Sequence, residues 1–236
     1  LDQIGLEKGV DALQRFGIGI EEEDKYLGLA LGGMHKGLSP LQLAEAYSTF
    51  PNEGRRYESH LITEIVGPTG NVIAEHKPKS TKVTSKTVSD EITSMLLNVV
   101  ETGTGAGIKI KGVTLAGKTG STQLPYSDIK GTKDQWFVGY TPNLVGAVWL
   151  GYDKTDREHY LPNSTSEGVV PLFRAIMEQS LQHVEPAGGA RAVRADPAHP
   201  PGTRGHDPGL PGYANLHSRP VRHGLHHRLG LCAGPH

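Results

Sequence analysis

The sequence of 236 residues predicts an α+β fold, and three features of it support that class. Helical patterns of apolar residues occupy much of the first hundred positions, three short apolar segments follow at close intervals, and one more helical pattern comes after them. Helices that precede and follow a run of neighbouring strands are typical of an antiparallel sheet flanked by helices. We therefore expect the three apolar segments to form one antiparallel sheet.

Two helical patterns open the chain. Residues 6–16 carry apolar side chains at roughly helical spacing, and glycines end the pattern directly afterwards. A second helix is predicted to begin at Ser39, which can cap it, with Pro40 in the first turn and Gln42 closing a capping box. It should end at residues 52–54. Its apolar side chains are expected to be buried: Leu43, Ala46, Tyr47 and Phe50.

A hairpin and the most regular helical pattern of the chain come next. Residues 61–66 and 71–74 are strand-like and flank Gly-Pro-Thr-Gly, which indicates a β-hairpin. The helix that follows should end at the glycines of residues 103–107. Its apolar side chains form one stripe: Val88, Ile92, Met95, Leu96, Val99 and Val100.

The predicted sheet comes from residues 113–122, 136–141 and 144–152. These segments are rich in β-branched and aromatic residues and are separated by short connections, which favours neighbouring antiparallel strands. Residues 169–184 then indicate a closing amphipathic helix. One side of that helix is apolar, with Val170, Phe173, Met177 and Leu181.

The composition divides the chain into residues 1–187 and a tail of residues 188–236. Of the 49 tail residues, 29 are Gly, Pro, His or Arg, and none is Lys, Glu, Ile, Phe, Met or Trp. So few large apolar groups cannot offset an ordering cost of roughly 1–2 kcal/mol per residue, so we expect a disordered tail. A metal-binding tract at His223, His226 and His227 and an out-of-frame translation are the alternatives.

Charge and cysteine content exclude several classes of protein. With 24 basic and 25 acidic side chains the formal charge is −1, which argues against a sequence-blind nucleic-acid binder. Cys232 is the single cysteine, so an internal disulfide framework and a multi-cysteine metal site are excluded. The longest clean apolar run, residues 144–152, is far shorter than the roughly 20 residues of a membrane helix. Because the chain opens at Leu1 without a leader or a methionine, we expect a fragment.

Residues 112–122, Gly-Val-Thr-Leu-Ala-Gly-Lys-Thr-Gly-Ser-Thr, support two incompatible interpretations. Gly112 to Thr119 match Gly-x-x-x-x-Gly-Lys-Thr, a phosphate-binding loop, and Asp153 could hold magnesium. Such a loop must lead directly into a helix. Here glycine, serine and threonine follow, and then Pro125, which makes a poor helix start. Nucleotide binding is therefore the alternative function.

The second interpretation is Lys-Thr-Gly on a strand, a signature of penicillin-interactive serine enzymes. Their substrate ends in a carboxylate, so a lysine cation and hydroxyl donors would have to converge on an anion. Six blocks of this sequence closely resemble class A penicillin-binding proteins, in the family's order and over about residues 1–185. These blocks are residues 29–33, 37–50, 95–105, 116–122, 134–142 and 148–153.

The resemblance implies a D,D-transpeptidase, an enzyme that cross-links peptidoglycan stem peptides through an acyl-serine intermediate. Lys118 would then supply charge, and the hydroxyls of Thr119 and Ser121 would donate to the substrate carboxylate. Gly120 would leave room for the substrate backbone, and the Ser121 amide would serve the oxyanion hole. Thr122 completes the substrate-binding segment. The resemblance implies no cofactor and no metal.

The motifs that carry the nucleophile in that family are not found ahead of Lys118. The sequence contains Ser-x-x-Lys only at Ser127–Lys130, where no helical pattern would stack the two side chains. We therefore expect residues 1–187 to be the C-terminal part of a transpeptidase domain that is inactive alone. The implied partners are D-Ala-D-Ala stem peptides and β-lactams, without nucleic acid. The implied location is the extracytoplasmic face of the bacterial membrane, through an anchor outside this chain.

Overall fold

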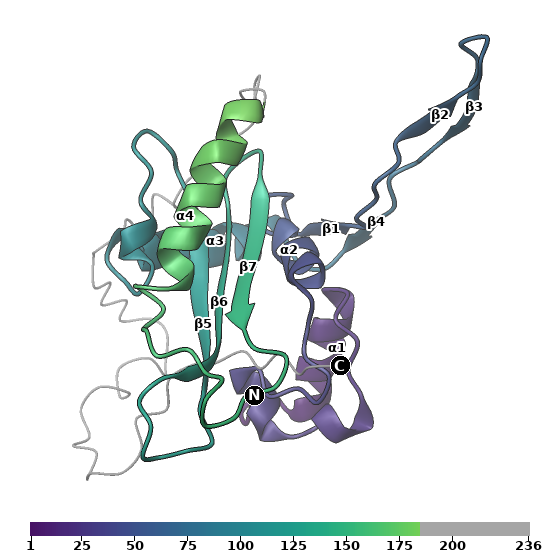
Figure 1. Ribbon diagram of the computed structural model, residues 1–236. Coiled ribbons are helices and arrows are strands. Elements are labelled where there is room, and N and C mark those ends of the chain that lie inside the picture. The colour runs from purple at the N-terminus through teal and green to yellow at the C-terminus, as the bar shows by residue number, and fades with distance from the viewer. Residues whose placement is uncertain (185–236) are drawn as a thin grey trace, which may run out of the picture.

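The computed structural model describes residues 1–184, and its centre is a three-stranded antiparallel sheet with helices on both faces (Figure 1). The strands are β5 (Ala116–Gln123), β6 (Thr132–Tyr140) and β7 (Val145–Gly151), in the order β5-β6-β7. Three main helices pack on this sheet: α2 (Pro40–Ser48), α3 (Lys86–Glu101) and α4 (Val169–Ser180). The predicted α+β class is confirmed, whereas the predicted tail lies outside the described residues.

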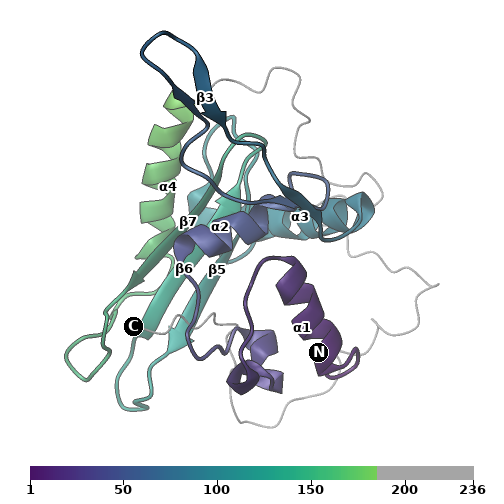
Figure 2. The ribbon, with the colours of Figure 1, turned by 90° about the vertical axis from the view of Figure 1, so that its right-hand side faces the viewer.

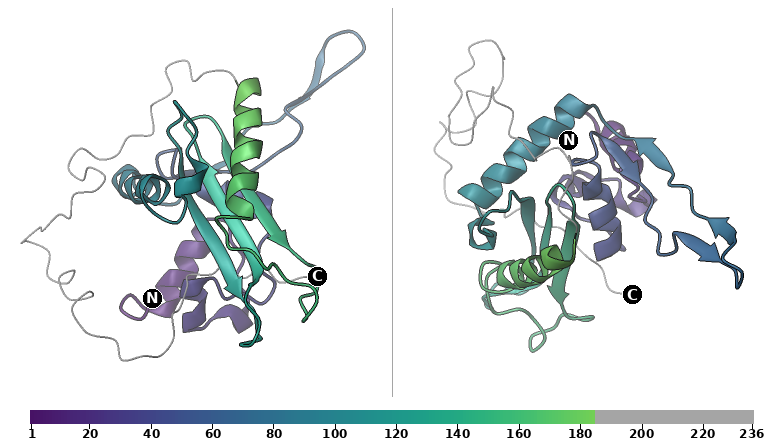
Figure 3. Two further views of the ribbon diagram at one scale, coloured as in Figure 1. Left: turned by 60° about the vertical axis from the view of Figure 1, so that its left-hand side comes forward. Right: turned by 90° about the horizontal axis from the view of Figure 1, so that it is seen from above.

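The strand register fixes which side chains share a face of the sheet. Lys118 is opposite Val138, which is in turn opposite Ala147, so these three side chains lie on one face. Helix α2 covers that face and lies across the strands in Figure 2, while α4 packs on the opposite face. Helix α3 crosses beside β5 at the end of the sheet (Figure 3).

Two of the buried clusters hold the sheet between its helices. On the α4 side, Phe137 is fully buried and its ring lies 4.6 Å from that of Phe173, centroid to centroid. On the α2 side, Leu43 packs with Trp136 and Val138. Burial of such side chains contributes about 1.5–3 kcal/mol each, so the two clusters fix β6 as the centre of the fold.

The helix boundaries follow the sequence signals closely. Helix α1 (Leu6–Arg15) ends before Gly17, which has φ +84°. Helix α2 has the predicted capping box, with Ser39 accepting from the Gln42 amide, although Phe50 lies beyond its last residue. Short 3-10 turns occupy Glu22–Asp24, Leu27–Leu31, Ala106–Ile108 and Leu181–His183, the last of them replacing the end of the helix expected to reach residue 184.

The apolar stripe of α3 is only partly buried. Val88 and Met95 are 42% and 58% exposed, whereas Ser89 and Thr93 are buried. The hydroxyl of Thr93 lies 2.7 Å from that of Tyr140, so a polar contact with β6 fixes the rotation of this helix. The apolar periodicity of the helix does not predict such a contact.

A two-stranded arm projects from the body between α2 and α3 (Figure 1). It is the predicted hairpin, formed by β2 (Glu64–Val66) and β3 (Val72–Glu75) around residues 67–71. A second pair at its base, β1 (Arg55–Tyr57) with β4 (Ser80–Lys82), was not predicted. All residues of β2 and β3 are exposed.

Within residues 1–184, none of the helices is both long enough and apolar enough to cross a membrane.

Candidate functional site

Strand β5 carries the five residues predicted to bind substrate, and it is an edge strand. Within residues 1–184 its only neighbouring strand is β6, so the other edge of β5 is open in this part of the chain. Side chains alternate along it: Lys118, Gly120 and Thr122 lie on the face covered by α2. Thr119 and Ser121 lie on the other face. A ligand at the open edge could therefore contact both sets.

The Lys118 ammonium bends back towards its own strand. Its Nζ donates to the carbonyl oxygen of Thr119 at 2.8 Å and approaches the Thr119 hydroxyl at 3.4 Å. Burial lowers the pKa of Lys118, because a half-buried ammonium is less well hydrated than one in water. The cation is thus held at the strand edge, beside a hydroxyl.

The Thr119 hydroxyl has a second partner from another element. The hydroxyl of Thr104, in the turn after α3, lies 2.8 Å from it. Thr119 is 8% exposed, so this contact accounts for much of its polar environment. In the sequence, Thr104 is marked only by its place between Gly103 and Gly105, within one of the blocks that resemble the family.

A buried carboxylate supports the far end of the strand. Asp134 is directly opposite Thr122 and is 1% exposed. The Trp149 indole donates to its Oδ1 at 3.0 Å, and the Thr122 side chain also bonds to it. Burial raises the pKa of Asp134, and these two donors and nearby Lys133 offset only part of the rise.

Gly117, directly before Lys118, is required by close packing. A Cβ at this position would lie 2.6 Å from the Phe137 ring and 2.8 Å from the carbonyl oxygen of Val138. Both atoms belong to the buried central strand. The glycine therefore lets β5 lie close against β6.

An apolar pocket of about 310 Å³ opens beside the lysine. Lys118, Thr119 and Gly120 form one wall. The rest comes from α1, the loop before α2, and α2 itself, with Leu13, Ile18, Leu29, Ala30, Leu31, Gly32, Met34, Leu38, Leu43 and Tyr47. The site thus combines a cation and a hydroxyl with an apolar surface.

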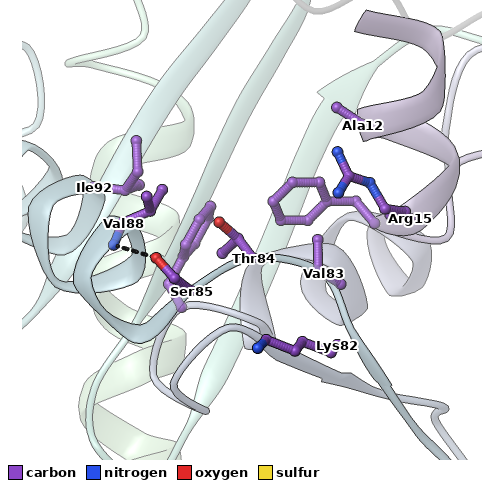
Figure 4. A pocket seen from close by; sticks show the side chains of 10 residues that line it. Ala12, Arg15, Lys82, Val83, Thr84, Ser85, Val88 and Ile92 are labelled. Carbon is purple, nitrogen blue, oxygen red and sulfur yellow. Dashed lines mark hydrogen bonds between the residues drawn. The ribbon is translucent and has the colours of Figure 1, made fainter. Parts of the chain in front are cut away.

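A larger pocket of about 670 Å³ lies away from the lysine, between α1, β4 and the start of α3 (Figure 4). Its two cationic side chains come from different elements, Arg15 from α1 and Lys82 from β4. Ser85 lines it too, but its hydroxyl caps α3 by accepting from the Val88 amide. None of the residues predicted to bind substrate lines this pocket.

The phosphate-loop alternative is contradicted by the backbone. Residues Ala116–Gln123 form a strand, so Lys118 and Thr119 do not lead directly into a helix as a phosphate-binding loop requires. Ser127 and Lys130 are exposed in the irregular connection after β5, as expected, and are not stacked on a helix. Among residues 1–184, no cluster of His, Cys, Asp and Glu is suited to a metal ion.

Comparison with known proteins identifies the domain. Residues 2–178 match the family model of the penicillin-binding protein transpeptidase domain. The chain is 40% identical over 183 residues to penicillin-binding protein 2a of Streptococcus pneumoniae, covering 78% of this chain and 25% of that protein. It is 47% identical over 181 residues to penicillin-binding protein 1F of Bacillus subtilis, covering 76% and 24%. The chain thus spans about a quarter of the length of these relatives.

A solved structure shows the same fold. The PonA1 protein from Mycobacterium tuberculosis, in complex with penicillin V, superimposes with a TM-score of 0.61 at 25% identity. The match covers 82% of this chain and 56% of that one.

Proposed function

This chain belongs to the penicillin-binding protein transpeptidase family, and from that premise we propose that β5 binds the terminal carboxylate of a peptidoglycan stem peptide. The observation that carries the proposal is the Lys118 ammonium held 3.4 Å from the Thr119 hydroxyl on an open strand edge. A cation beside a hydroxyl donor is suited to a carboxylate. Ser121 supplies a second hydroxyl, Gly120 leaves room for the substrate backbone, and Thr122 extends the binding segment.

The Ser121 amide is proposed as the oxyanion donor. The Thr119 carbonyl accepts from Lys118, which indicates that the polar groups of this residue point to the open edge. In an antiparallel strand, N–H and C=O groups of every second residue point the same way, so the Ser121 amide would also face that edge. One such donor contributes about 10²–10³ in rate in acyl transfer.

The chemistry is that of a serine acyl-transferase that forms peptide cross-links, which β-lactams intercept. Peptidoglycan lies outside the membrane, so we place the working site on the extracytoplasmic side. Ser127 is not the nucleophile, because it is exposed in a turn and no helix holds it against Lys130. The polypeptide of 236 residues is therefore proposed to be inactive alone.

The carboxylate site can be tested by titrating the labelled chain with N-acetyl-D-Ala-D-Ala and with the amide of the same dipeptide. The chemical shifts of the chain's backbone N–H groups, measured by NMR, give the dissociation constants of the two ligands. The acid should bind more tightly than the amide, and Lys118→Met should remove the difference. Lys130→Met is the matched control, an exposed lysine close in sequence, and should keep it. Equal affinity for acid and amide in the unchanged chain would contradict the proposal.

The inactivity proposal has a separate test. Incubation with a fluorescent penicillin, followed by mass spectrometry under denaturing conditions, should find no covalent adduct. An adduct that disappears in Ser127→Ala would show that the turn serine is reactive after all.

A further inference from the structure

The turn after α3 holds Thr104 in a defined place. The amides of Gly103 and Gly105 both donate to the carbonyl oxygen of Val99, each at 3.1 Å. A Cβ at Gly103 would lie 2.9 Å from that oxygen, so the turn requires a glycine there. Gly105 is buried, with a Cβ position 3.3 Å from the Phe137 ring. Thr104 therefore projects from a turn that is packed on both sides.

The Thr119 hydroxyl has two neighbours, the Lys118 ammonium and the Thr104 hydroxyl. A threonine hydroxyl has one hydrogen to donate and two lone pairs with which to accept. The Lys118 ammonium can only donate, so it uses one lone pair at 3.4 Å. The Thr104 hydroxyl, at 2.8 Å, can either donate or accept. If it donates, both lone pairs are used, and the Thr119 hydrogen is left for a ligand.

We propose that Thr104 is a positioning residue for substrate binding, which orients the Thr119 hydroxyl so that it donates to the carboxylate. This inference rests on the carboxylate site proposed above. An anion can only accept hydrogen bonds, so its arrival favours the arrangement in which Thr104 donates to Thr119 and Thr119 donates to the anion. Thr104 acts through Thr119 and confers preference for an anion over a neutral group.

A purely structural role for Thr104 makes a different prediction. Thr104 is exposed, so the loss of its hydroxyl should cost the fold little. A structural contact would affect acid and amide ligands alike, because both use the same strand. A positioning role would affect only the ligand that carries the carboxylate. The ratio of the two affinities therefore separates these possibilities.

The experiment compares Thr104→Val, which has nearly the same shape without the hydroxyl, with Thr104→Ser, which keeps it. The control is Thr102→Val, two residues earlier, whose hydroxyl bonds to the backbone and side-chain oxygens of Asn98 and not to β5. Each variant is titrated with N-acetyl-D-Ala-D-Ala and its amide by NMR. Thr104→Val should weaken binding of the acid by about tenfold and leave binding of the amide unchanged. Thr104→Ser and Thr102→Val should bind as the unchanged chain does.

Thr119→Val provides a further check. If Thr104 acts through Thr119, the two valine substitutions combined should weaken binding of the acid no more than Thr119→Val alone. Additive effects, or equal weakening of acid and amide by Thr104→Val, would overturn the inference. If Thr104→Val binds normally while Lys118→Met loses its preference for the acid, Thr104 has no positioning role and the carboxylate site stands. If the unchanged chain shows no preference for the acid, the carboxylate site itself is refuted, and this inference with it.

Discussion

Replacing Gly117 with alanine should destabilise the fold strongly, because the added methyl group meets atoms that cannot move away. It would lie 2.6 Å from Phe137 Cε1 and 2.8 Å from the carbonyl oxygen of Val138, whereas ordinary contact begins at about 3.4 Å. The Phe137 ring is fully buried and packs against Phe173. The Val138 carbonyl belongs to the central strand.

The size of the effect follows from this rigidity. Overpacking a well-filled core by one methyl group costs about 1–3 kcal/mol, and here both obstacles are held by the sheet. We expect a loss at the upper end of that range, about 2–3 kcal/mol. For a domain of this size, that corresponds to a melting temperature about 5–10 °C lower.

Denaturant unfolding monitored by tryptophan fluorescence measures the loss in free energy of unfolding. An unchanged m-value would show that the two proteins expose the same amount of surface on unfolding. Gly19→Ala is the matched control, since a Cβ there meets nothing within 4 Å, and it should unfold as the unchanged chain does. Phe137→Leu combined with Gly117→Ala should cost less than the sum of the two single substitutions, because the smaller side chain relieves part of the clash. Unfolding of Gly117→Ala at the same denaturant concentration as the unchanged chain would refute the reasoning.

Three further predictions concern two carboxylates and the edge of the sheet formed by β7. Glu45→Ala should cost about 1–3 kcal/mol because it leaves Arg56, whose side chain is only 15% exposed, without its carboxylate. Burial raises the pKa of Glu45, but hydrogen bonds from the backbone and side chain of Ser59 and from Arg56 outweigh burial and hold this pKa below 4.5. The urea midpoints of Glu45→Ala and of the unchanged chain should therefore converge as the pH falls below 4.5 and the carboxylate is protonated. Asp134→Asn should be no less stable than the unchanged chain at pH 7, because the raised pKa of Asp134 means that the folded state disfavours its charged form. Any gain in melting temperature should vanish as the pH falls to 3.8, where the carboxyl of the unchanged chain is protonated in the folded state. A melting temperature that is lower than that of the unchanged chain by the same amount at every pH would contradict this. The free edge of Val145–Gly151 should cause concentration-dependent association in sedimentation velocity runs, and a monomer at all concentrations would contradict this.

Sequence patterns predicted the helices and the three strands because these elements depend on local signals. The capping box at Ser39 and the β-branched segments are examples in which one stretch of chain determines its own conformation. The pairing of β1 with β4 was missed because Arg55 and Lys82 lie opposite each other, 27 positions apart, without an apolar alternation to signal a strand. The rotation of α3 was missed for the same reason, since it depends on the distant Tyr140 hydroxyl.

The candidate site was only partly predictable. Lys118 and Thr119 follow from a tripeptide that carries chemistry, and the strand that holds them was predicted correctly. Thr104 could not be found in this way, because its role comes from a contact across 15 positions. Asp134 was likewise part of a family-like block without any assigned chemistry, and only the fold reveals it as a buried carboxylate beneath Thr122.

The projecting arm gives the chain a convenient point of attachment. Strands β2 and β3 pair with each other and extend away from the sheet, and their connection consists of small and polar residues (Figure 1). Connections of this kind tolerate inserted sequence well, because no core side chain has to move. A fluorophore or an affinity tag placed between Pro68 and Thr69 would therefore report on the molecule while leaving the lysine-bearing strand untouched.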